Sequence, residues 1–141
     1  MRIDSDPAHL AAARKAVEAF AVAGGLTEKA SHDMGLCLNE ALANVMRHAY
    51  GGRRDQPIAI TASTDERELI VTVRDWGNGI DPSTIPHEPY NPLTPGGVGL
   101  ICLNELLDRM VYEPQADGML ATLVKKKEGK QRSQEPEAKS Q

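Results

Sequence analysis

The stretch that decides the fold is PIAITASTDERELIVTVRDWGNGID, residues 57–81. Residues 57–63 and 68–75 are rich in β-branched side chains and alternate between apolar and polar, and the polar TDER between them has the composition of a turn. This pattern predicts two strands joined as a hairpin, whose strands pair antiparallel. The sequence therefore disfavours a doubly wound parallel sheet.

Two amphipathic helices are predicted before this hairpin. Asp6 followed by Pro7 is a helix-start signal, and apolar residues then recur at helical spacing as far as Gly24-Gly25. Thr27 caps a second and longer helix over residues 28–48, which YGG at 50–52 stops. The helices are thus grouped together rather than alternating with strands.

The remaining elements follow the hairpin. DPSTIPHEPYNPLTP, residues 81–95, holds five prolines and predicts a long loop, of the kind that often forms a lid or a binding loop. GGVGLICLNELLD then predicts a third helix that ends near Asp108. RMVYE at 109–113 and MLATLVKK at 119–126 predict a second hairpin, and MRID at the N-terminus a short edge strand.

This order of elements predicts an α+β fold, a two-layer sandwich in which a mixed, mostly antiparallel sheet carries helices on one face. Residues 1–126 form the predicted domain. Residues 127–141 are polar and charged without periodicity, so we expect a disordered tail there.

Composition narrows the classes of function. The chain has 141 residues, 40% of them hydrophobic and 26% charged, as is usual for one globular domain. A net charge of −4 argues against direct binding of nucleic acid, which needs a basic face. There is no apolar run long enough to span a membrane, so a cytoplasmic location is expected. Cys37 and Cys102 have no CxxC spacing and are read as free thiols.

The second predicted helix contains LCLNEALANVMRHAYGG, residues 36–52. Glu40 and Asn44 are four residues apart and therefore project from the same face of the helix. A carboxylate and an amide oxygen on one face are hard oxygen groups that could meet Mg²⁺ or its water shell. The alternative for this pair is a solvated polar stripe.

The second motif is VRDWGNGID, residues 73–81, in which Asp75 lies where a strand ends. Gly77 and Gly79 allow positive φ, so the backbone can lie flat against a planar ligand. A carboxylate at this position could accept a hydrogen bond from an exocyclic amine. A plain turn is the alternative.

The third motif, TPGGVGLICL at 94–103, sets Gly96, Gly97 and Gly99 directly before a helix. A helix N-terminus offers unpaired amides and a partial positive charge, which suits a phosphate. The Walker lysine is absent, which excludes a P-loop, and no strand leads into the motif as a dinucleotide fingerprint requires. The alternative is a helix start padded with glycine.

The three motifs occur in one order, and together they resemble the N, G1 and G2 boxes of the Bergerat-fold (GHKL) ATP-binding proteins, a group that includes histidine kinases and gyrase. NEALANVMRHAYGG, VRDWGNGIDP and GGVGLICLNELLD look most like the bacterial anti-sigma-factor serine kinases of partner-switching pathways. The resemblance extends from about Arg2 to Lys125.

The resemblance implies ATP and Mg²⁺ as cofactors. Asn44 would be the Mg²⁺ ligand, Asp75 would receive the adenine amino group, and Glu40 would be the general base that takes a proton from a seryl or threonyl hydroxyl. Further nucleotide contacts would come from His48, Gly77, Gly79, Ile80, Gly97, Val98, Gly99, Leu100 and Thr122.

The resemblance also implies an ATP-dependent protein serine/threonine kinase that phosphorylates a STAS-type antagonist, sequesters a sigma factor or other regulatory protein and acts as a homodimer. One feature favours an alternative, a catalytically silent ATP-gated interaction module. Between Ile80 and Leu100 there is no Lys or Arg, whereas a cation in the lid would stabilise the charge of the transferred phosphoryl group. The arginines that could replace it from the end of the second helix are Arg47, Arg53 and Arg54.

Overall fold

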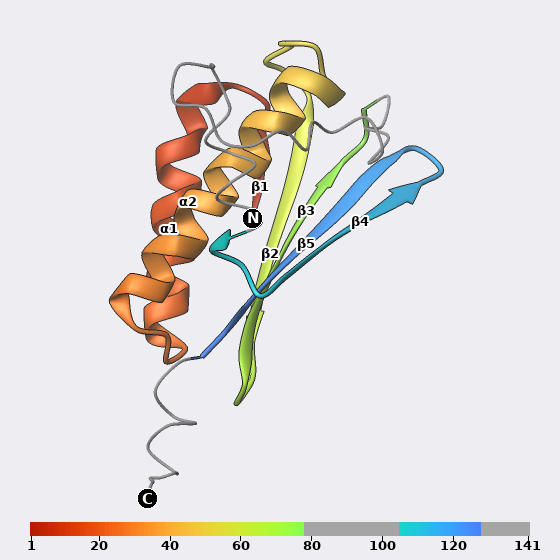
Figure 1. Ribbon diagram of the computed structural model, residues 1–141. Coiled ribbons are helices and arrows are strands. Elements are labelled where there is room, and N and C mark those ends of the chain that lie inside the picture. The colour runs from red at the N-terminus through yellow and green to blue at the C-terminus, as the bar shows by residue number, and fades with distance from the viewer. Residues whose placement is uncertain (78–104, 128–141) are drawn as a thin grey trace, which may run out of the picture.

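The computed structural model describes residues 1–77 and 105–127, in which two long helices cover one face of a five-stranded sheet (Figure 1). The predicted Pro-rich loop, most of the predicted third helix and the tail beyond Lys127 lie outside these residues. In chain order the elements are β1 (Arg2–Asp4), the 3₁₀ turn η1 (Pro7–His9), α1 (Leu10–Ala23), α2 (Glu28–Asn44), the π-helix η2 (Val45–Ala49), β2 (Pro57–Thr64), β3 (Glu68–Asp75), β4 (Arg109–Gln115) and β5 (Gly118–Lys126).

Both helix starts form as their caps predict. The Asp6 side chain accepts a hydrogen bond from the backbone N–H of Ala8 at 2.9 Å, although the first turn is 3₁₀ rather than α. Thr27 Oγ1 accepts one from Ala30 N at 3.0 Å. Each cap satisfies a backbone donor that has no partner within its helix, so Asp6 fixes the start of η1, which runs into α1, and Thr27 fixes the start of α2.

The sheet has the strand order β1-β2-β3-β5-β4, so β3 is the central strand. The predicted hairpin is β2–β3, and its second strand has the predicted bounds 68–75. All strand pairs among the described residues are antiparallel, so the predicted mixed character is not found in this part of the chain. β1 is the predicted edge strand and pairs with β2.

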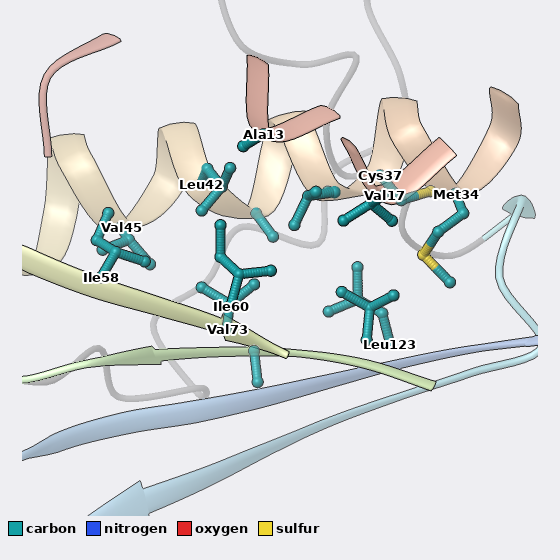
Figure 2. Packing of buried hydrophobic residues seen from close by; sticks show 14 of the residues in the cluster. Ala13, Val17, Met34, Cys37, Leu42, Val45, Ile58, Ile60, Val73 and Leu123 are labelled. Carbon is teal, nitrogen blue, oxygen red and sulfur yellow. The ribbon is translucent and has the colours of Figure 1, made fainter. Parts of the chain in front are cut away.

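The core lies between the helices and the sheet. Leu42 of α2 packs toward Ile60 of β2 and Val73 of β3, and all three are at most 2% exposed (Figure 2). Burying each such side chain contributes about 1.5–3 kcal/mol. This packing fixes α2 against the central strand β3, and it thereby also fixes the positions of the polar residues at the ends of α2 and β3.

The end of the second helix departs from a regular α-helix. From Val45 to Ala49 the turn widens to a π-helix, and Tyr50 N donates to Val45 O at 3.0 Å. Gly51 and Gly52 then adopt φ of 58° and 86°, which stops the helix where YGG predicts. Short π segments inside helices often mark functional sites.

Candidate functional site

The site is built around Asp75, the last residue of β3. Its side chain is 1% exposed, and Oδ1 accepts a hydrogen bond from Gly77 N at 3.0 Å. Burial raises the pKa of this carboxyl, while hydrogen bonds from the backbone of Gly77 and Met119 and the charge of Arg74 partly oppose the rise. A carboxyl group held in place and poorly solvated at the end of a central strand is a candidate for binding a hydrogen-bond donor of a ligand.

Gly77 lies against the end of the π-helix. A Cβ added at Gly77 would come 2.5 Å from the backbone oxygen of Ala49, closer than any real contact. Only glycine fits this approach without a shift of the backbone. The contact joins the turn after β3 to the segment that follows Asn44, so the first two sequence motifs meet at the same end of the sandwich (Figure 1).

A second contact joins the same two segments. Tyr50 is 5% exposed, and its hydroxyl accepts a hydrogen bond from Trp76 N at 2.8 Å while donating to Pro57 O at 2.6 Å. Tyr50 therefore links the end of η2 to the start of β2 and the exit of β3. Sequence reasoning missed this residue, because its partners lie 7 and 26 positions away and no local pattern announces them.

Glu40 and Asn44 occupy the last full turn of α2, and both are partly exposed. Their four-residue spacing puts them on one face, as predicted, while Ala41 and Leu42 between them are buried in the core. Asn44 Oδ1, the oxygen predicted to face a metal, accepts a hydrogen bond from Arg47 Nη2 at 2.9 Å. A guanidinium thus lies beside the amide and is exposed to solvent.

The described residues contain no group of three or more His, Cys, Asp or Glu side chains that could hold a metal ion. A cage of protein ligands is therefore not available in residues 1–77 and 105–127. Mg²⁺ seldom needs one, since it keeps several waters and is commonly bound through one or two protein oxygens plus substrate phosphates. The Asn44 oxygen fits that mode of binding.

The other residues predicted to contact the nucleotide fall into three groups according to where they lie. His48 lies on η2 and is exposed. Thr122 of β5 pairs with Thr72, whereas Met119 pairs with Asp75. Because side chains alternate along a strand, Thr122 points to the face opposite Asp75 and does not share a pocket with it. The positions outside the described residues are Gly79, Ile80, Gly97, Val98, Gly99 and Leu100.

Trp76 belongs to the second sequence motif, but no contacts were predicted for it. Its ring makes cation–π contacts with two guanidinium groups, with Arg2 Cζ 5.0 Å and Arg74 Cζ 4.7 Å from the ring centroid. Arg74 Nη2 also pairs with Asp117 Oδ1 at 2.7 Å. These contacts anchor the strand exit to β1 and to the β4–β5 turn, and cation–π pairs of this kind contribute about 0.5–1 kcal/mol when exposed.

The sequence is similar to those of known proteins. Residues 3–125 match the histidine kinase-like ATPase domain family. The serine-protein kinase RsbW of Listeria monocytogenes is 24% identical over 138 residues, covering 91% of this chain and 88% of that protein. RsbW of Oceanobacillus iheyensis is 26% identical, covering 85% and 81%, and RsbW of Bacillus subtilis 26% identical, covering 78% and 74%.

A solved structure is similar as well. The histidine kinase domain from the blue-light activated histidine kinase EL346 of Erythrobacter litoralis superposes with a TM-score of 0.54 at 19% identity. The match covers 84% of this chain but only 59% of that one, and at this identity it shows the fold alone. No helix within residues 1–77 and 105–127 has the length and apolar character needed to cross a membrane. With a family match that spans nearly all of the described fold, the chain belongs to the histidine kinase-like ATPase domain family.

Proposed function

We propose that the chain binds ATP and transfers its γ-phosphoryl group to a serine or threonine of a STAS-type antagonist, and that it also sequesters a sigma factor or other regulatory protein. The observation that carries the proposal is the buried carboxyl of Asp75 at the exit of the central strand, packed through Gly77 against the segment that follows Asn44. The relatives named serine-protein kinase RsbW support the kinase class.

Asp75 is suited to recognising adenine. One carboxyl oxygen is held by Gly77 N, which orients the group and leaves acceptor capacity for the exocyclic amine of the base. Gly77 has no side chain to obstruct the approach of a flat ring, and its position is set by Ala49. The base would therefore be selected by a hydrogen bond that inosine or guanine, with a carbonyl in place of the amine, cannot make.

The phosphate end would lie along Asn44 and Arg47. Mg²⁺ bound with the nucleotide would neutralise phosphate charge, and the Asn44 oxygen is the ligand that the described residues offer it. Arg47 would leave Asn44 and turn to a phosphate oxygen, a stronger acceptor than a neutral amide. This would supply from η2 the cation that the sequence between Ile80 and Leu100 lacks.

Glu40 would act one helical turn before Asn44. Its partly exposed carboxylate can take the proton of a seryl or threonyl hydroxyl as that oxygen attacks the γ-phosphorus. Phosphoryl transfer needs mainly positioning and charge neutralisation, so a base together with Mg²⁺ and the amides of a helix N-terminus would be a sufficient minimum. Phosphorylation adds about two negative charges, which would disrupt packing at the interface and release the antagonist unless arginines receive them.

The test is transfer to the antagonist, captured by pull-down from the source cells and followed by intact mass with ATP and Mg²⁺. The unmodified chain should add one phosphoryl group and Glu40→Gln none, because the amide cannot take a proton. Glu28→Gln is the matched control, since it makes the same change on an exposed residue in the first turn of α2 and should keep full transfer. Equal transfer by Glu40→Gln would remove Glu40 from the reaction.

A second candidate function is an ATP-gated interaction module without phosphoryl transfer. The absence of Lys and Arg between Ile80 and Leu100 favours it. In that case ATP should bind, no chain should gain mass, and Glu40→Gln should leave the ATP dependence of partner binding nearly intact. The same two samples therefore separate the two functions.

A further inference from the structure

The hydroxyl of Tyr50 takes the place of a hydrogen bond in the sheet. In the β2–β3 ladder Ile58 lies opposite Asp75 and Ala59 opposite Arg74, so the next pair would be Pro57 with Trp76. Pro57 O and Trp76 N are the two atoms that such a pair could join. Instead the Tyr50 hydroxyl lies between them, donating to the carbonyl at 2.6 Å and accepting from the amide at 2.8 Å.

This insertion ends the ladder at Asp75. With the hydroxyl between them, the backbones of Pro57 and Trp76 stay further apart than a direct hydrogen bond of about 2.9 Å allows. The chain after Asp75 is then free to leave the sheet, and it turns toward η2, where Gly77 meets Ala49. Tyr50 is buried, and both its donor and an acceptor lone pair are used, so its position is well defined.

The turn that Tyr50 holds is the one that orients Asp75. Gly77 N is the group that binds Asp75 Oδ1, and it follows immediately after the amide bound by Tyr50. Tyr50 and Ala49 also belong to the segment that continues from Asn44. We infer that Tyr50 is a positioning residue for nucleobase recognition, which sets the direction of the Asp75 carboxyl and its distance from the helix carrying Glu40 and Asn44. This inference rests on the proposed binding of ATP.

The test compares the affinities for ATP and for inosine triphosphate in the unmodified chain and in the Tyr50→Phe variant. Tyr50→Phe keeps the ring and removes the hydroxyl, so Trp76 N and Pro57 O must either pair directly or lose their partner. In both cases the turn after Asp75 shifts. Inosine triphosphate carries a carbonyl where ATP carries the amine, and its neighbouring N1 carries a proton where N1 of adenine is an acceptor. The ratio of the two affinities therefore measures hydrogen bonding along the edge of the base that would face Asp75.

The unmodified chain should prefer ATP over inosine triphosphate by about tenfold or more, the effect expected for a hydrogen bond to a charged group. In Tyr50→Phe this preference should fall by about fivefold or more, while the affinity for inosine triphosphate stays within about twofold. If Tyr50 only stabilised the fold, the substitution would lower the affinities for both nucleotides by a similar factor. Tyr112→Phe, the same change on β4, is the control and should keep the preference.

Failure of the inference and failure of the proposed function on which it rests would give different results. A Tyr50→Phe chain that keeps the full preference for ATP would overturn the inference. An unmodified chain that binds both nucleotides equally would overturn the recognition of adenine by Asp75, on which the inference rests. An unmodified chain that binds neither nucleotide would overturn the proposed function instead. Far-ultraviolet circular dichroism checks in each sample that the fold is retained.

Discussion

Replacing Asp75 by Asn should weaken ATP binding while leaving the free protein at least as stable as before. The amide keeps the size of the side chain and an oxygen for Gly77 N, but it presents an N–H₂ group where the carboxylate would accept the adenine amine. Losing a hydrogen bond to a charged acceptor costs about 1.5–3 kcal/mol, or about 10- to 150-fold in affinity.

The effect on stability has the opposite sign. Burial raises the pKa of Asp75 above its ordinary 3.8, so the folded protein holds this proton to higher pH than the unfolded chain does. Between those two pKa values the folded state binds more protons, and the free energy of unfolding therefore falls as pH rises through this window. Asp75→Asn does not titrate and avoids this loss. At neutral pH the ligand-free variant should unfold at the same temperature as the unmodified chain or higher.

Thermal unfolding with and without ATP measures both effects. At an ATP concentration 100 times the dissociation constant, binding should stabilise the unmodified chain by about 2.7 kcal/mol, or about 9 °C in Tm. A variant that binds 100-fold more weakly would gain only about 0.4 kcal/mol, or about 1 °C.

Asp33→Asn is the control, because Asp33 is another buried carboxyl but lies near the start of α2, where it pairs with Lys29. It should lower Tm and keep the full ATP shift. An Asp75→Asn chain that shows the same ATP shift as the unmodified chain would refute the role of Asp75 in binding the base. A ligand-free Asp75→Asn chain that unfolds well below the unmodified one would refute the account of its stability.

Two further substitutions test other parts of the site. Arg47→Ala should lower the affinity for ATP by about 10-fold or more and that for AMP by less than about twofold, because a charged hydrogen bond to the terminal phosphates is lost while the base is held as before. Calorimetric titration measures both affinities, and equal losses for the two nucleotides would show that Arg47 does not contact these phosphates. Thr122→Val should leave ATP affinity within about twofold of the unmodified value, because Thr122 faces away from Asp75; a tenfold loss in the same titration would restore Thr122 to the pocket.

Much of the fold was predictable because its signals are local. Asp6 and Thr27 lie close to the backbone amides that they cap, and alternation, β-branched side chains and the TDER turn together predicted the bounds of β3. Asp75 and Gly77 were predicted to act together, and they are joined by a hydrogen bond between residues two positions apart.

The rest depends on contacts between distant parts of the chain. Thr122 was assigned to the nucleotide, but its face depends on the register of β5 against β3, and Met119 rather than Thr122 lies opposite Asp75. Tyr50 was read only as part of the signal that stops a helix. Its two hydrogen bonds exist only once the β2–β3 hairpin has formed beside the π-helix, so no pattern within the helix could reveal them.

The most direct test of the central claim is calorimetric titration of the unmodified chain with ATP, in the presence and absence of Mg²⁺ and in parallel with GTP. The proposed site predicts one ATP bound per chain, tighter with Mg²⁺, and much weaker binding of GTP, whose base has a carbonyl where adenine has its amine. Absence of ATP binding, or equal affinity for ATP and GTP, would contradict a nucleotide site built on Asp75.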